Sequence, residues 1–174
     1  MTKPRRQGTL MMPDIPELLS GLKAAPKILR EFIATIPEEK TVLRRGEGFW
    51  TIAEHVSHLA EVQPMLLQRF RRFMEEEQPE FVPFIPGKAG NEPEAKTCMS
   101  ISAALQQFAE CRAQQLLLLE KSENIRWQKT AVHPEYDQYS LAIFTRHVFM
   151  HDYWHMYRIE ELWLAKDGYL TQLV

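Results

Sequence analysis

Apolar residues recur every three or four positions in four stretches of the chain, which is the spacing of amphipathic α-helices. The pattern predicts helices over residues 14–36, 51–77, 100–122 and 140–165. No alternation of apolar and polar residues extends far enough to predict a β-sheet. Four helices of this length predict an all-α fold, an antiparallel four-helix bundle in which the apolar stripes face one another.

Local signals mark where these helices begin and where they bend. Asp14 is the expected N-cap of the first helix. Thr51-Ile52-Ala53-Glu54 matches a capping box at the start of the second. Pro26 lies inside the first helix and predicts a kink or a break, because proline has no amide N–H.

The helical pattern stops between residues 78 and 99, where the chain carries four prolines and two glycines. This stretch is too long for a tight turn and predicts a long crossover connection over the surface of the bundle. A loop of this length can also cover a pocket. We expect one bundle domain over residues 13–174 and a flexible tail over residues 1–12.

The composition excludes several classes of protein. The 174 residues carry a net charge of −2, and basic residues gather only at the N-terminus, so neither nucleic acid nor an acidic tail is indicated. No signal peptide and no apolar stretch of ~20 residues is present, which predicts no membrane span. The cysteines Cys98 and Cys111 fit no metal or disulfide spacing. We therefore expect a cytoplasmic protein.

Three histidines lie four residues apart on the last predicted helix, at positions 147, 151 and 155. Imidazoles four apart can reach one ion from one face, whereas those eight apart are separated by ~12 Å along the axis. The apolar stripe of this helix includes His151 and His155 and leaves His147 at its edge. The pair expected to point inward is therefore His151 and His155.

A third ligand is expected from the second helix, where His55 and His58 lie three apart and share a side. Periodicity slightly favours His55, and geometry alone leaves both open. His133, in the loop before the last helix, is expected at the surface near the rim of the site. The alternative is that these histidines are packed in the core with ordinary hydrogen bonds, although burying imidazoles without partners costs a few kcal/mol.

Two motifs together resemble those of the DinB-like superfamily. Trp50-Thr51-Ile52-Ala53-Glu54 followed by His58-Leu59-Ala60 is similar to its second-helix motif. His133-Pro134-Glu135, then His151-Asp152 and His155, are similar to its C-terminal motif. The resemblance implies a four-helix bundle with a divalent metal, commonly zinc or nickel, held by three histidines. Matched motif to motif, these are His58, His151 and His155, which resolves the choice between His55 and His58.

The resemblance also implies a function. Characterised members include thiol S-transferases that use low-molecular-weight thiols, isomerases and hydrolases, and dimers are common. We therefore expect a homodimeric, metal-dependent transferase or hydrolase that acts on a small molecule. The alternative is a non-catalytic bundle that binds a metal, a ligand or a partner protein.

Three further residues near these motifs are candidate catalytic or supporting groups. Asp152 and Glu54 could each hydrogen-bond to an imidazole, and Glu54 is also expected to serve the capping box. The chain departs from the family after the last histidine, where Met156-Tyr157-Arg158-Ile159 replaces a small-polar pair. Arg158 could bind an anionic substrate group or pair with an acid such as Glu54 or Glu161.

Overall fold

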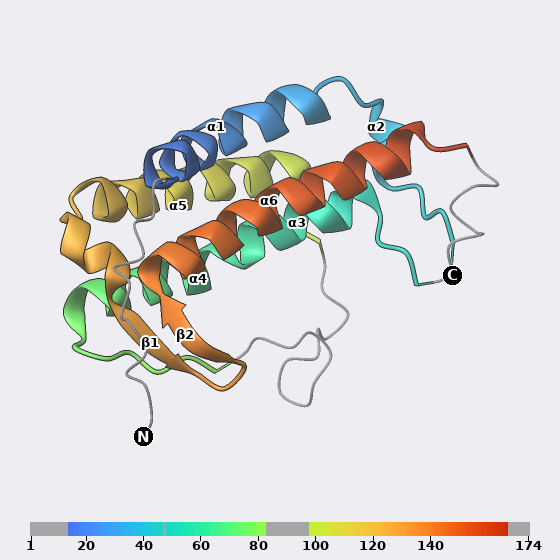
Figure 1. Ribbon diagram of the computed structural model, residues 1–174. Coiled ribbons are helices and arrows are strands. Elements are labelled where there is room, and N and C mark those ends of the chain that lie inside the picture. Colours follow the sequence, from blue (N-terminus) through green and yellow to red (C-terminus); the bar gives the residue numbers. More distant parts are fainter. Residues whose placement is uncertain (1–13, 47, 83–97, 167–174) are drawn as a thin grey trace.

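Long helices lie side by side as a four-helix bundle, which confirms the predicted fold (Figure 1). The computed structural model describes residues 14–46, 48–82 and 98–166. The predicted tail over residues 1–12 lies outside these ranges, as does most of the predicted crossover, residues 83–97. In chain order the elements are α1 (Ile15–Ile33), α2 (Glu38–Thr41), α3 (Ile52–Glu61), α4 (Gln63–Glu75), α5 (Ile101–Glu120), the 3₁₀ helix η1 (Asn124–Gln128), β1 (Thr130–His133), β2 (Tyr136–Ser140) and α6 (Leu141–Leu164).

The direction of the helices differs from that of a simple antiparallel bundle. α5 runs in the same direction as α3 and α4 (Figure 1). Two hydrogen bonds follow this course: Met99 N–H, just before α5, donates to Ser57 Oγ within α3, and Gln115 Nε2 further along α5 donates to Gln63 Oε1 at the start of α4. α6 likewise runs with α1, and antiparallel to α3. The connection between α4 and α5 therefore has to return to the end of the bundle where α3 begins.

No sheet was predicted from the sequence, yet β1 and β2 form an antiparallel hairpin before α6 (Figure 1). Ala131 pairs with Tyr139, and a shift of register follows between Ala131 and His133. Both strands are only four or five residues long. Such a short alternation does not stand out from a loop, which is why the expectation of no sheet was wrong.

The second predicted helix is divided at Val62 into α3 and α4. Pro64 explains the division, because it has no N–H to donate to the carbonyl of Ala60, four residues earlier. Gln107 Nε2 on α5 donates to that carbonyl instead, at 3.0 Å. Proline is well tolerated in the first turn of a helix, which is its position in α4.

Two other expectations about the first helix differ from the structure. α1 continues through Pro26 as one helix, so the chain does not break there. Asp14 occupies the N-cap position without a side-chain capping bond. Its carboxylate instead pairs with Arg146 of α6 at 2.6 Å, which ties the start of α1 to α6.

A layer of polar side chains separates two apolar clusters in the core. One cluster lies at the hairpin end and includes Phe70, Phe73 and Phe144, and the other includes Leu29, Phe108 and Ile159 at the far end. Between them, where packing alone would predict apolar residues, α4, α5 and α6 bury the polar residues Gln63, Arg112, Gln115 and Asp152. The histidines of α3 and α6 lie beside this layer. Within the described ranges, none of the helices combines the length and the apolar character needed to cross a bilayer.

Candidate metal centre

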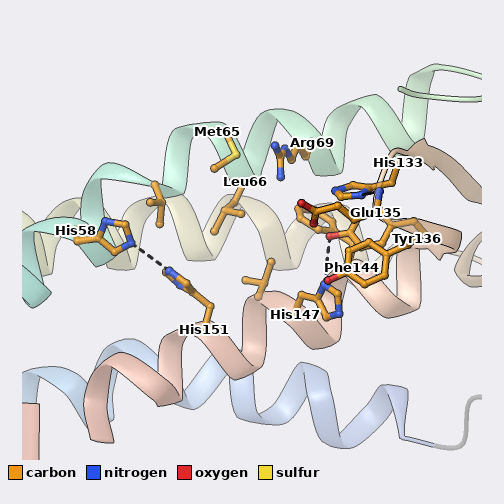
Figure 2. Close-up of a pocket in the computed structure, with 13 residues that line it drawn as sticks. His58, Met65, Leu66, Arg69, His133, Glu135, Tyr136, Phe144, His147 and His151 are labelled. Carbon is orange, nitrogen blue, oxygen red and sulfur yellow. Dashed lines mark hydrogen bonds between the residues drawn. The ribbon is translucent and has the colours of Figure 1, made fainter. Parts of the chain in front are cut away.

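Three imidazoles from two helices converge on one point of the bundle. His58 of α3 and His151 and His155 of α6 each offer a ring nitrogen, and these nitrogens all lie within 4.8 Å of one another. His58 Nε2 and His151 Nε2 are 3.2 Å apart and point toward each other across the gap between the helices (Figure 2). The structure therefore brings together the three histidines that the family resemblance named.

One pair of nitrogens in the group has the spacing that a divalent metal requires. Zinc lies 2.0–2.1 Å from histidine nitrogens in tetrahedral sites, which places two such nitrogens ~3.3 Å apart. The 3.2 Å between His58 Nε2 and His151 Nε2 matches this value. The nitrogen of His155 lies within 4.8 Å of the other two, so the donor set of three imidazoles fits a divalent ion.

His55 does not join the three-histidine group, although it touches it. Its Nδ1 lies 2.8 Å from Nδ1 of His155, and both rings are buried. Burial, followed by the nearby charge of Arg158, lowers the pKa of His55 to about 4. Burial and the neighbouring histidines lower the pKa of His155 to about 2. Both rings are therefore neutral at pH 7, and one of them donates to the other.

The direction of this hydrogen bond follows from the requirements of a metal. A ligand nitrogen must offer a lone pair, and the other ring nitrogen then carries the proton. If His155 binds through Nε2, its Nδ1–H donates to Nδ1 of His55. Sequence periodicity favoured His55 as a ligand, whereas its position beside His155 indicates a supporting role.

Asp152 lies on the inner side of His151 and is completely buried. Its Oδ2 accepts from Arg112 of α5 at 2.6 Å, and its Oδ1 lies 4.0 Å from His151 Nδ1. In the described structure neither Oδ1 nor that Nδ1 has a hydrogen-bond partner. A carboxylate behind a ligand histidine is the usual arrangement in metal sites, because it fixes the ring through its N–H. The placement suits Asp152 to orienting His151 rather than to touching a substrate.

The other two candidate residues are engaged in structural contacts. Glu54 completes the capping box with Thr51, and its other oxygen accepts from Arg44 at 2.5 Å. These contacts lower its pKa against the opposing effect of burial. Arg158 pairs with Glu161 one turn further along α6. Of the alternatives that the sequence left open for Arg158, the structure shows the acid pair.

Aromatic rings enclose the outer side of the histidine group. The ring of Trp50 lies 5.0 Å from that of His58 and stacks on His155 at 6.0 Å between centroids. Trp154 meets His155 edge-on at 4.7 Å. The two indoles are themselves partly exposed, Trp50 at 39% and Trp154 at 55%, so they form an aromatic rim beside the histidines.

Sequence reasoning named Asp152 as a possible partner of an imidazole but missed Arg112 and the buried ion pair between the two. Arg112 and Asp152 occupy positions on the apolar stripes of α5 and α6, where a charged residue is unusual. The signal available in the sequence was a basic residue on the apolar stripe of α5 and an acidic residue on that of α6, which together indicate a buried ion pair. The predicted stripe of α6 passed through His151, but Asp152 is the buried residue and the side chain of His151 is 33% exposed.

The sequence of the whole chain was compared with the profiles of known protein families. The sequence profile of the DinB superfamily matches residues 22–163, which include all four histidines at the centre. The chain belongs to the DinB superfamily. A search of the curated proteins finds no match to it.

The DinB bundle of this chain resembles that of a solved structure, YfiT from Bacillus subtilis. The two share 22% sequence identity and superpose with a TM-score of 0.76, over 92% of this chain and 91% of that one. YfiT is described as a probable metal-dependent hydrolase with an unusual four-helix bundle topology. The likeness shows that the DinB fold extends over nearly the whole chain.

Proposed function

We propose that this DinB protein is a metal-dependent enzyme whose centre consists of His58, His151 and His155, with zinc or nickel as the ion. The observation that carries the proposal is the convergence of three ring nitrogens within 4.8 Å, from two different helices. The same residues are the ones that the family resemblance assigns to the metal. Imidazole suits both zinc and nickel, so the donor set is compatible with either ion.

The reaction proposed is transfer of a low-molecular-weight thiol or hydrolysis of a small molecule. A divalent ion held by three neutral imidazoles keeps a position open, and it lowers the pKa of a water or thiol bound there. The hydrolase description of YfiT supports the second form. The known thiol transferases of the family support the first.

The residues of this chain have distinct parts in the proposal. His58 and His151 border a pocket, so a small molecule can approach them directly. His55 contacts the far side of the His155 ring and fixes its proton, whereas Asp152 Oδ1 lies 4.0 Å from His151 Nδ1 and would fix the proton of that ring after a shift of about 1 Å. An accessible pocket at the ligands favours an enzyme over a purely structural metal site. The expected homodimer belongs to the same proposal.

Metal analysis of the protein prepared without a polyhistidine tag tests the centre. We expect about one equivalent of zinc or nickel in the wild type, and its loss in each of the variants His58→Ala, His151→Ala and His155→Ala. His147→Ala is the matched control, because His147 lies on the same helix but bonds to Tyr139 instead. Metal retained by all three ligand variants would contradict the proposal.

Activity assays then separate an enzyme from a non-catalytic binder. The metal-loaded protein is tested with cysteine and other small thiols against electrophiles, and with small esters and amides. We expect turnover that disappears with His151→Ala and survives in Glu160→Gln, an exposed position on the same helix. Stoichiometric metal without turnover across both panels would favour the alternative of a metal- or ligand-binding bundle.

A further inference from the structure

A pocket of about 310 Å³ extends from the histidine centre toward the β1–β2 hairpin. His58 and His151 border one end, and Figure 2 places Arg69, His133 and Glu135 together at the other. Between the two ends the wall is apolar. It consists of Val62, Met65 and Leu66 from the α3–α4 side and Phe144 and Val148 from α6. The volume is at the lower limit of the range for small-molecule sites.

Arg69 places a guanidinium in the wall of the pocket without a carboxylate beside it in the described chain. Its one hydrogen bond there goes from Nη2 to the carbonyl of Val82, at 2.7 Å, and the guanidinium lies 5.4 Å from the ring of Phe81. Its neighbours on α4 are engaged differently: Arg72 pairs with Glu76, and Arg71 donates to Gln114.

The lowered pKa of Arg69 shows that its charged form is destabilised in this position. Burial lowers the pKa of its guanidinium, in contrast to that of Arg72, which the bond to Glu76 raises. A partly desolvated cation without a counter-ion is unfavourable, and an anion bound next to it offsets the cost. Glu135, the carboxylate among the described lining residues, is exposed and forms no ion pair with Arg69.

Neutral hydrogen-bonding groups surround this cation. Tyr139 and His147 also line the pocket, and the Tyr139 hydroxyl lies 3.4 Å from His147 Nδ1. Burial raises the pKa of Tyr139 to about 12 and lowers the pKa of His147 and of His133. At pH 7 these groups add polar N–H and O–H donors without adding negative charge, so the exposed Glu135 is the one carboxylate of the described lining, and it does not pair with Arg69.

We propose that the hairpin end of the pocket is a subsite for an anionic oxygen group of the substrate, a carboxylate or a phosphate ester, with Arg69 as its cationic partner. The apolar wall would hold the stem that joins this group to the reacting end. Arg69 lies eleven residues after His58, which corresponds to ~16 Å along a helix. The reacting end at the histidines rests on the proposed function, whereas the anion subsite does not require the metal.

Titration with three six-carbon probes tests the subsite. Hexanoate, hexyl phosphate and neutral 1-hexanol are titrated into ¹⁵N-labelled protein, with zinc and again with EDTA, and binding is followed by amide chemical shifts. We expect one or both anions to bind the wild type about tenfold or more tightly than hexanol, with shifts on α4, α6 and the hairpin. The anion that binds more tightly identifies the group as carboxylate or phosphate ester.

Variants assign the effect to Arg69. Arg69→Gln should weaken anion binding about tenfold or more and leave hexanol unchanged. Arg71→Gln, an exposed arginine on the same helix, should leave both unchanged. Equal binding of hexanol and the anions by the wild type would overturn the proposal even if Arg69→Gln failed to fold. Undiminished anion binding by folded Arg69→Gln would overturn it as well.

The same experiment distinguishes failure of the subsite from failure of the proposed function. If the protein holds no stoichiometric metal but binds anions in EDTA in a way that depends on Arg69, the anion subsite is supported and the proposed metal-dependent enzyme is contradicted. If the protein holds stoichiometric metal but its anion binding does not depend on Arg69, the metal centre is supported and the anion subsite is contradicted.

Discussion

His55 contacts the proposed centre through a single nitrogen, which makes its contribution measurable apart from that of the three ligands. Its Nδ1 lies 2.8 Å from His155 Nδ1, and the ring is buried between Trp50 and Trp154. In this position its Nδ1 can accept a hydrogen bond from the N–H that His155 must carry at Nδ1 when its Nε2 binds a metal. The hydrogen bond fixes the tautomer as well as the rotation of the ligand ring.

Replacing His55 by alanine should therefore weaken metal binding without abolishing it. Loss of a supporting group of this kind typically costs about 10–100-fold in affinity. Competition of the protein with a chromophoric chelator for zinc at pH 7.5 measures the change. His55→Gln, which keeps an acceptor oxygen, should lose less, and His133→Ala on the hairpin should lose nothing. Complete loss of metal in His55→Ala would instead identify His55 as a ligand.

The candidate site was predictable from the sequence to the extent that it consists of metal-binding residue types at helical spacing. His151 and His155 follow from their separation of four and from the apolar stripe. The choice of His58 over His55 depends on the relative rotation of α3 and α6, which the periodicity of one helix does not contain. The family motif supplied that choice. The sequence does not single out Arg69, because the absence of a carboxylate beside its guanidinium becomes visible only in the folded structure.

At the scale of the elements, the ion pair between Arg112 and Asp152 joins α5 to α6 inside the polar layer. The two side chains are 1% and 0% exposed, and the bond length is 2.6 Å. Arg112 also contacts Gln63 of α4 at 3.4 Å. The layer thus links three helices at the level of the histidines, where apolar packing is interrupted.

Removing one member of this pair should destabilise the bundle strongly. Arg112→Met or Asp152→Leu alone leaves a buried charge without its partner, which costs about 3–5 kcal/mol. The double variant should lose much less than the sum, because neither charge remains. Urea unfolding in EDTA measures these values, with the exposed pair Lys27–Glu31 as a control that should change stability by less than about 1 kcal/mol. Additive losses would show that the two residues act independently.

The elements themselves were predicted unequally well. The four long helices follow from apolar periodicity over ~20 residues each, and the capping box at Thr51 marks the start of α3 correctly. The hairpin was missed because its strands are short. The parallel course of α3–α4 and α5 could not be predicted, because a long connection permits α5 to begin at either end of the bundle.

At the scale of the whole molecule, the buried histidines couple folding to pH. In the unfolded chain both His55 and His155 have a pKa near 6.5, whereas in the fold the values are about 4 and about 2. Below pH 6.5 the unfolded chain therefore binds more protons than the folded protein. Because the folded pKa values are depressed, the stabilising contribution is complete above pH 6.5 and decreases as the pH falls.

Metal-free protein should accordingly lose stability between pH 7 and pH 5. Each of the two histidines contributes a loss of about 2 kcal/mol at pH 5. Urea unfolding in EDTA across this range measures the slope, and the double variant His55→Gln/His155→Gln should show a flatter profile. The carboxylates of Asp14 and Glu54, whose pKa values are also lowered, act only at lower pH. A stability that stays constant from pH 7 to pH 5 would contradict the prediction.

The two helices that meet at the centre are distant in the order of synthesis. His58 and His151 are separated by 93 positions along the chain. A chain that is still emerging from the ribosome presents His58 long before its partners exist, and it cannot hold the ion with one imidazole. In the proposed enzyme, acquisition of metal therefore waits until α6 has been made and has docked. Occupancy of the centre would then report completed assembly, and a product truncated before α6 would keep one of the three ligands and none of the affinity.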